Sequence, residues 1–163
     1  MLSGNDELKQ SILPGIAGGN VIMTSALTET EGSYAIEGIE SIGEPGADGY
    51  VLRGRKMFVP DAHIADYIIY PARTYQKDHS NGVSLFIVDA KREGIEMTPL
   101  ISLELQKQSE VSFRDVEVPK KSLVGEDGKG WTLIQGLWPI AVTGKCCEML
   151  GAMQQVLEMT LSY

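Results

Sequence analysis

A run of short strand-like stretches between residues 21 and 119 constrains the fold more than any other feature of the sequence. Clusters of turn residues interrupt the run, among them 44–49 and 78–82. Many short strands in about 100 residues are typical of a β-barrel or β-sandwich. The sequence therefore predicts a mainly β domain, with strands over 21–28, 34–42, 50–53, 56–59, 66–73, 83–89, 95–98 and 109–118.

Two of these stretches predict details of the sheet. Residues 83–88 are almost continuously apolar, which indicates a central strand buried on both faces. The stretch 109–118 is apolar at odd positions up to Phe113 and at even positions from Val116 onward. Since side chains alternate between the two faces of a strand, this change of phase predicts a β-bulge at the intervening Arg-Asp pair.

Helices are expected on both sides of the β region. Residues 3–13 carry two acidic residues in the first turn, and Pro14 with the following glycine is expected to end that helix. After Lys121 the pattern predicts a loop and a long helix, with Pro139 in its first turn or at a kink. One face of this helix is expected to be apolar, through Cys146, Leu150, Met153, Leu157 and Leu161.

Composition excludes several classes of function. The 163-residue chain has a formal net charge of −8, which argues against a nucleic-acid partner, because phosphate backbones select basic surfaces. Cys146 and Cys147 are adjacent and are expected to be reduced and buried, as in an intracellular protein. No stretch resembles a membrane span or a secretion signal. We therefore expect a soluble, cytoplasmic protein.

Two segments look suited to holding a flat cofactor. Residues 26–34 run from apolar residues into a hydroxyl and a carboxylate, after which Gly32 is expected to turn the chain and leave backbone amides uncovered. Residues 56–61 place Phe58 near the end of a strand, where an aromatic ring can stack on a heterocycle. Either segment alone is more often an ordinary turn or a piece of core.

The order of five segments resembles the acyl-CoA dehydrogenase family. The resemblance covers nearly the whole chain and implies a middle-domain β-barrel that holds FAD, with the acyl-CoA thioester between the flavin and C-terminal helices. It divides the chain into the end of an N-terminal helical region (1–20), the flavin-binding barrel (21–120) and a loop with the first helix of a C-terminal bundle (121–163). The five segments are Leu8–Pro14, Ala26–Glu29, Gly54–Asp66, Val111–Pro119 and Leu123–Trp131.

The resemblance also implies site residues. Leu27 and Thr28 are expected at the edge of the isoalloxazine ring, and Ser33 near both FAD and the acyl-CoA chain. The chain departs from the family pattern by one residue missing before Gly32, by Thr30 for proline, by Tyr34 for aspartate and by Pro60 for a hydroxyl residue. These departures shift the expected contacts toward the backbone. The expected cofactor-binding residues are Leu27, Thr28, Gly32, Ser33, Phe58, Val59 and Pro60.

No residue of this chain matches the catalytic base of the family. Most members use a glutamate that would lie beyond Tyr163, and the position used by a minority falls on Ala141, which cannot accept a proton. Glu148 matches neither position and is expected on a solvated helix face. His63 lacks a second ligand at metal-binding spacing, so no metal site is expected.

The interpretation that follows is an FAD-dependent acyl-CoA dehydrogenase, of which this chain is a middle-domain fragment that is inactive alone. The resemblance implies an electron-transfer flavoprotein as partner and a homo-oligomeric intact protein. Two alternatives stay open: a flavin-dependent oxidase or monooxygenase of the same fold, and a catalytically silent β-barrel module. The length of the acyl group is not encoded in these residues.

Overall fold

The computed structural model describes residues 6–33, 35–74, 82–103 and 106–163. The first residues of the predicted N-terminal helix and most of the predicted turn at 78–82 lie outside this range. The chain divides into two compact units, Met1–Trp131 and Thr132–Tyr163, which are treated separately below.

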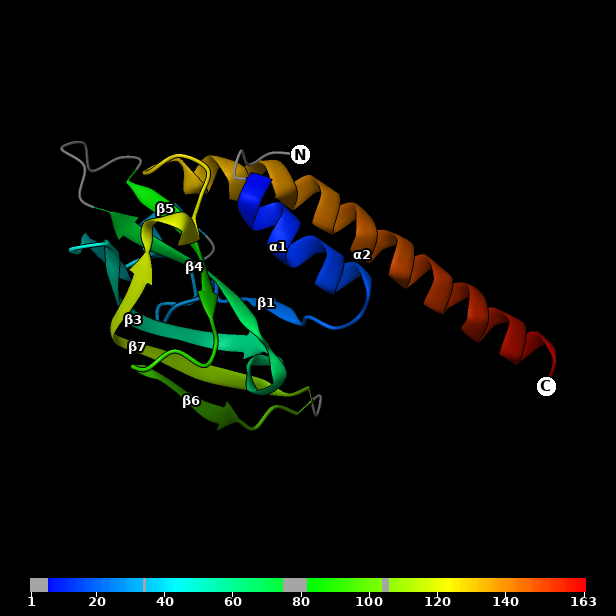
Figure 1. Cartoon of the computed structure of the whole chain (residues 1–163). Coiled ribbons are helices and arrows are strands. Elements are labelled where there is room, and N and C mark those ends of the chain that lie inside the picture. Colours follow the sequence, from blue (N-terminus) through cyan, green and yellow to red (C-terminus); the bar gives the residue numbers. More distant parts are fainter. Residues whose placement is uncertain (1–5, 34, 75–81, 104–105) are drawn as a thin grey trace. The chain divides into compact units, whose positions relative to one another are not determined.

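The first unit contains an eight-stranded sheet (Figure 1). Its hydrogen-bonded order is β6-β7-β3-β2-β4-β5-β8, with β1 paired to β4 beside this path. The prediction of a mainly β domain is confirmed, but among the described residues this order does not close into a barrel. The strands are β1 (Met23–Ser25), β2 (Ile42–Pro45), β3 (Gly49–Pro60), β4 (Tyr67–Thr74), β5 (Val83–Asp89), β6 (Ile95–Leu100), β7 (Gln108–Pro119) and β8 (Leu123–Val124).

The sheet folds around a core whose large side chains come from β3, β4, β5 and β7. β5 is buried along nearly its whole length, as its continuous apolar sequence predicts. The predicted bulge in β7 is also confirmed: pairing passes from Leu52↔Val116 to Gly54↔Phe113, and the intervening Asp115 has a φ of +52°. Large core side chains are Leu52, Ile68, Tyr70, Phe86, Val88, Val111 and Val116.

Three predicted strands differ from the structure. The stretches 50–53 and 56–59 form one strand, β3, because Gly54 marks a close approach rather than a break. A Cβ at Gly54 would collide with the Ser41 hydroxyl and lie 2.8 Å from the Tyr70 hydroxyl.

The predicted strand 34–42 is instead a 3-10 turn, η1 (Ile36–Gly38), and β2 occupies part of the turn predicted at 44–49.

The N-terminal helix, α1 (Asp6–Ala17), continues past Pro14, so the predicted end at that proline is wrong. It ends at two glycines, where the Gly18 amide donates to the Pro14 carbonyl at 2.9 Å and Gly19 adopts a φ of +70°. A left-handed glycine after the last turn is a common helix stop, and it sets this boundary. Short 3-10 turns, η2 (Ala62–Ile64) and η3 (Lys120–Ser122), complete the first unit.

The second unit consists of helix α2 (Gly130–Leu161) from Thr132 onward, with Pro139 inside the helix. Its apolar side chains are not confined to the predicted face, since Leu137, Ile140 and Val156 are exposed in addition to the predicted stripe. Cys146 and Cys147 are free and exposed rather than buried, because a lone helix does not enclose its side chains. Within the part of the chain that the structure describes, no helix is long and apolar enough to cross a membrane.

Candidate functional site

The structure brings the two predicted cofactor segments side by side. The Met57 amide donates a hydrogen bond to the Thr28 carbonyl at 2.8 Å, which links the segment after β1 to the end of β3. Leu27 and Thr28 are half-buried, so each presents part of its surface. The segments around Thr28 and Met57, which are far apart in the sequence, therefore form one continuous surface.

Phe58 lies on a β-bulge that turns its ring outward. Pairing passes from Lys56↔Val111 to Val59↔Ser109, so that two residues of β3 oppose one residue of β7. Phe58 has a φ of +55°, which is uncommon for a bulky residue and strains the backbone. Its side chain is 55% exposed, whereas the next residue, Val59, is 1% exposed. The bulge thus presents an aromatic ring without disturbing the core.

Val59 and Pro60 have other roles in the structure. The Val59 side chain belongs to the hydrophobic core. The Pro60 carbonyl accepts a hydrogen bond from the Thr24 hydroxyl at 2.6 Å, which ties β1 to the end of β3. Of the three predicted residues in this segment, Phe58 and Pro60 are exposed, whereas Val59 is buried and could reach a ligand only through its backbone.

Gly32 and Ser33 lie farther along the loop that follows Thr28. Gly32 has a φ of +68° and its amide donates to the Glu29 carbonyl at 2.9 Å, so this amide closes a turn and is not uncovered as predicted. The Ser33 hydroxyl accepts a hydrogen bond from the Ala35 amide at 3.1 Å. Space beside Gly32 is open, since an added Cβ would meet nothing within 4 Å.

A buried ion pair beneath these segments was not predicted. Lys56 donates to a Glu29 carboxylate oxygen at 2.5 Å and to the Pro71 carbonyl at 2.8 Å, with the Tyr70 ring centroid 4.8 Å from its ammonium nitrogen. The Lys56 side chain is 0% exposed and that of Glu29 7% exposed. A lysine on the inward side of an alternating strand is rare unless it is paired, and this was the signal available in the sequence.

The Glu29 carboxylate also accepts backbone hydrogen bonds. The Glu40 amide donates to it at 2.9 Å and the Ser41 amide at 3.2 Å. Burial lowers the pKa of Lys56 to about 8, and the attraction of Glu29 opposes this shift without reversing it. Burial likewise raises the pKa of the neighbouring Tyr70 phenol. Every polar group of the pair therefore has a specific partner, as buried charge requires.

A second polar cluster anchors the loop before α2. The Thr74 and Ser84 hydroxyls each donate to the same Asp127 carboxylate oxygen at 2.6 Å. The Ser84 hydroxyl in turn accepts the Gly128 amide at 2.7 Å. Burial and the nearby Asp127 raise the pKa of Tyr50. This cluster fastens residues 125–130 to β4 and β5, and it lies apart from the cofactor segments.

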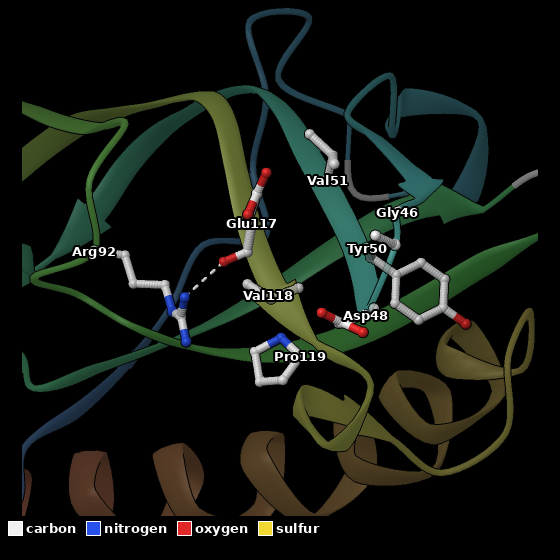
Figure 2. Close-up of a pocket in the computed structure, with 10 residues that line it drawn as sticks. Gly46, Asp48, Tyr50, Val51, Arg92, Glu117, Val118 and Pro119 are labelled. Carbon is white, nitrogen blue, oxygen red and sulfur yellow. Dashed lines mark hydrogen bonds between the residues drawn. The ribbon is translucent and has the colours of Figure 1, made fainter.

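The pocket in Figure 2 lies at the other end of β3, with a volume of about 250 Å³. Arg92 points to the Glu117 carbonyl and donates to it at 2.8 Å, while the Tyr50 ring borders the opposite side. Its charged lining residues are of mixed sign: Asp48 from the turn between β2 and β3, Arg92 from the segment between β5 and β6, and Glu117 from β7. Because β3 begins here and ends at Pro60, this pocket is separate from the Phe58 feature.

His63 borders another hollow, of about 390 Å³, beside the turn between β6 and β7. It is exposed within η2, as expected for a residue in a solvated turn. Among the described residues, no three histidine, cysteine or acidic side chains gather in a way that would hold a metal ion.

Comparison with known proteins gives a consistent result. Residues 24–116 match the model of the family described as acyl-CoA dehydrogenase, middle domain. The chain is 30% identical to an L-prolyl-[peptidyl-carrier protein] dehydrogenase from Serratia sp. (strain ATCC 39006), across 98% of the chain and 42% of that protein. It is 30% identical to the caffeyl-CoA reductase-Etf complex subunit CarC from Acetobacterium woodii, across the whole chain and 44% of that protein.

Solved structures agree with the sequence comparison. A structure described as the FAD complex of PigA superimposes with a TM-score of 0.71 at 31% identity, over 77% of this chain and 34% of that one. The chain thus spans less than half the length of the curated relatives named above.

Proposed function

Because the chain belongs to the acyl-CoA dehydrogenase family, we propose that it forms the flavin-binding part of an FAD-dependent oxidoreductase that introduces a double bond between the α and β carbons of an acyl-CoA thioester. The observation that carries this proposal is the Phe58 bulge beside Thr28. Backbone strain of this kind persists where the surrounding structure holds it, and it gathers at ligand-binding sites.

The described residues fit a flavin. Phe58 supplies an exposed ring for stacking, and Leu27 with Thr28 supplies a half-buried edge next to it. The open space beside Gly32 permits the close approach of a ligand to the backbone. FAD, when bound, supplies the hydride acceptor that no side chain provides. We propose Leu27, Thr28 and Phe58 as direct contacts, with Gly32, Ser33, Val59 and Pro60 contributing through their backbones and Ser33 also facing the substrate.

The base that removes the α proton is proposed to lie outside this chain. Glu29 is the carboxylate nearest to Thr28 in sequence, but it is buried and accepts hydrogen bonds from Lys56, Glu40 and Ser41. A carboxylate engaged in this way does not face a substrate. The role of residues 21–120 is therefore to hold and orient the flavin, and 1–20 and 121–163 would connect this domain to helical regions.

The whole protein is proposed to use partners known from its relatives. One relative is named as a subunit of a complex with Etf, which supports an electron-transfer flavoprotein as electron acceptor. Homo-oligomerisation of the intact protein remains part of the same proposal.

A thioester on a carrier protein is a second candidate substrate, because one relative is named as a dehydrogenase of L-prolyl-[peptidyl-carrier protein]. The two substrates share the thioester and differ in what carries it. Acyl-CoA is preferred here because it is the substrate that the family description names.

The test uses the protein purified at its native length and supplied with FAD. We expect a yellow protein that reduces an electron-accepting dye when an acyl-CoA is added, and more slowly with the same acyl group on a carrier protein. A colourless protein that reduces no dye with either thioester would contradict the proposal. Hydrogen peroxide release in place of dye reduction would instead indicate an oxidase.

A further inference from the structure

One segment of the first unit leaves the sheet and returns to it. β1 and β2 both pair in parallel with β4, in registers Met23↔Tyr67 and Ile42↔Arg73, while β5 occupies the other edge of β4. The last backbone hydrogen bond before the departure runs from the Ala26 amide to the Ile69 carbonyl, at 2.9 Å, and the first after the return runs from the Arg73 amide to the Ser41 carbonyl, at 2.7 Å. Between these two bonds, the Arg73 guanidinium group donates to the carbonyls of Ile36 and Ile39. We call the described residues between the two backbone bonds, 27–33 and 35–40, the excursion; its two ends lie next to each other along β4.

The excursion leaves a gap in the backbone pairing of β4, and Lys56 fills it. The gap falls at Pro71. Because proline has no amide hydrogen, only its carbonyl needs a partner, and that partner must be a hydrogen-bond donor. That partner is the Lys56 ammonium group, 2.8 Å from the Pro71 carbonyl. A side chain from β3 therefore takes the place of the missing neighbouring strand.

Glu29 closes the excursion at its base. It lies near the departure point, and its carboxylate accepts the amides of Glu40 and Ser41 at the return point. The same carboxylate accepts Lys56 at 2.5 Å. One buried group thus joins the start of the excursion, its end and the strand β3.

The ion pair sits directly beneath the candidate flavin contacts. Glu29 follows Thr28 in the chain, and Lys56 precedes Met57, whose amide bonds to the Thr28 carbonyl. The ion pair and this backbone bond are consecutive cross-links between the two segments that would touch the flavin. Movement of Glu29 relative to Lys56 would therefore move Thr28 relative to Phe58.

We infer that Glu29 and Lys56 are positioning residues for the flavin: their buried pair holds the excursion and the Phe58 bulge in one fixed relation, so that both segments meet the ring together. The inference rests on the proposed flavin function. A buried ion pair adds little net stability compared with apolar residues of similar size, whereas its directional hydrogen bonds favour a single geometry. Fixing the binding groups before the ligand arrives increases affinity.

The test compares two pairs of substitutions in the full chain. Glu29→Gln with Lys56→Met removes both buried charges together, so that neither is left unpaired. Arg55→Gln with Glu110→Gln is the matched control, because Arg55 is the neighbour of Lys56 on β3 and its ion pair with Glu110, at 3.2 Å, is exposed on the Arg55 side. Amide hydrogen exchange of the flavin-free chain and fluorescence titration with FAD are measured for each.

We expect the first pair to speed exchange at residues 27–41 at least tenfold while β5 keeps its protection, and to raise the Kd for FAD at least tenfold. The control pair should change both by less than twofold. Unchanged exchange at 27–41, or unchanged FAD affinity, would overturn the inference. If β5 also loses protection, Glu29→Gln alone is measured under the same two criteria.

A swap of the two residues separates directional bonding from simple charge attraction. Glu29→Lys with Lys56→Glu restores opposite charges but puts a donor against the amides of Glu40 and Ser41, so it should not rescue FAD affinity. Rescue to the wild-type Kd would overturn the positioning role. A wild-type chain that binds no FAD would overturn the proposed function and the ligand assigned here, while the exchange result would still show whether the pair holds the excursion.

Discussion

Arg55 and Lys56 are neighbours on β3, and their ion pairs differ in surroundings and in number of partners. The Arg55 side chain is 61% exposed and meets Glu110 at 3.2 Å across the β3–β7 pair. Lys56 is 0% exposed and meets Glu29, the Pro71 carbonyl and the face of Tyr70. The exposed pair is screened by water, whereas the buried pair ties together three segments. On the inner face of this strand, the charged group therefore bonds to two other segments, whereas on the outer face it meets a single partner across the sheet.

The largest effect is expected from breaking the buried pair on one side. Lys56→Met leaves the Glu29 carboxylate buried without its counter-ion, and should lower the free energy of unfolding by about 3–5 kcal/mol. Arg55→Gln should lower it by less than about 1 kcal/mol. Urea denaturation of both variants measures the difference, and similar losses would remove the contrast between the two faces of β3.

A methyl group at Gly54 tests how tightly the inner face is packed. Gly54 has a φ of +146°, and a Cβ there would collide with the Ser41 hydroxyl and approach the Tyr70 hydroxyl to 2.8 Å. Gly54→Ala should destabilise the chain by about 3 kcal/mol through overpacking and backbone strain. Gly32→Ala is the control, since that site is open, and its cost should be about 1 kcal/mol. Equal thermal shifts for the two variants would contradict this packing.

The pH dependence of stability sharpens the comparison further. Burial lowers the pKa of Lys56 from its ordinary value of 10.5 to about 8. Between these two pH values, Lys56 is therefore mostly deprotonated in the folded chain and mostly protonated in the unfolded chain. The free energy of unfolding should therefore rise with pH between about 8 and 10.5 on account of Lys56. Glu29 and Tyr70 are the titratable groups that face it.

Denaturation of the wild type and of the chain carrying both Glu29→Gln and Lys56→Met isolates this contribution, since the exposed lysines cancel in the difference. The wild type should gain stability relative to the variant as the pH rises through this window. A difference that stays flat or falls would show that the pKa of Lys56 is not lowered.

The smallest effect on stability is expected at Phe58. Phe58→Gly relieves the φ of +55° and removes a side chain that is 55% exposed, so stability should rise or fall by no more than about 1 kcal/mol. The Kd for FAD should nevertheless increase at least tenfold, because the stacking ring is lost. Unchanged FAD affinity would show that the strained bulge serves something other than the flavin.

Local patterns were sufficient to predict most of the sheet. Continuous apolar sequence predicted β5, and a change of phase predicted the bulge at Asp115. The strand predicted over 34–42 was wrong because the buried Ile39 follows a 3-10 turn. Its burial therefore does not reflect the alternation of buried and exposed side chains along a strand. The helix end predicted at Pro14 was wrong because the helix continues to Ala17, just before two glycines.

The sequence predicted the two segments that the structure brings together, but not the ion pair that lies beside them. The family resemblance, confirmed by the match over residues 24–116, identified the segments around Thr28 and Phe58. Glu29 and Lys56 are 27 positions apart, and their pairing depends on the excursion that separates β1 from β2 along β4. No local pattern encodes that topology, so the sequence indicated the two segments proposed to hold the cofactor and not the ion pair beneath them.

The most direct test of the account is to locate FAD on the full chain. Amide hydrogen exchange with and without FAD should show new protection at residues 27–33 and 57–59, and none at Gly46–Tyr50 beside the pocket in Figure 2. Protection confined to that pocket, or the absence of any change with saturating FAD, would contradict a flavin site at the Thr28–Phe58 end of β3.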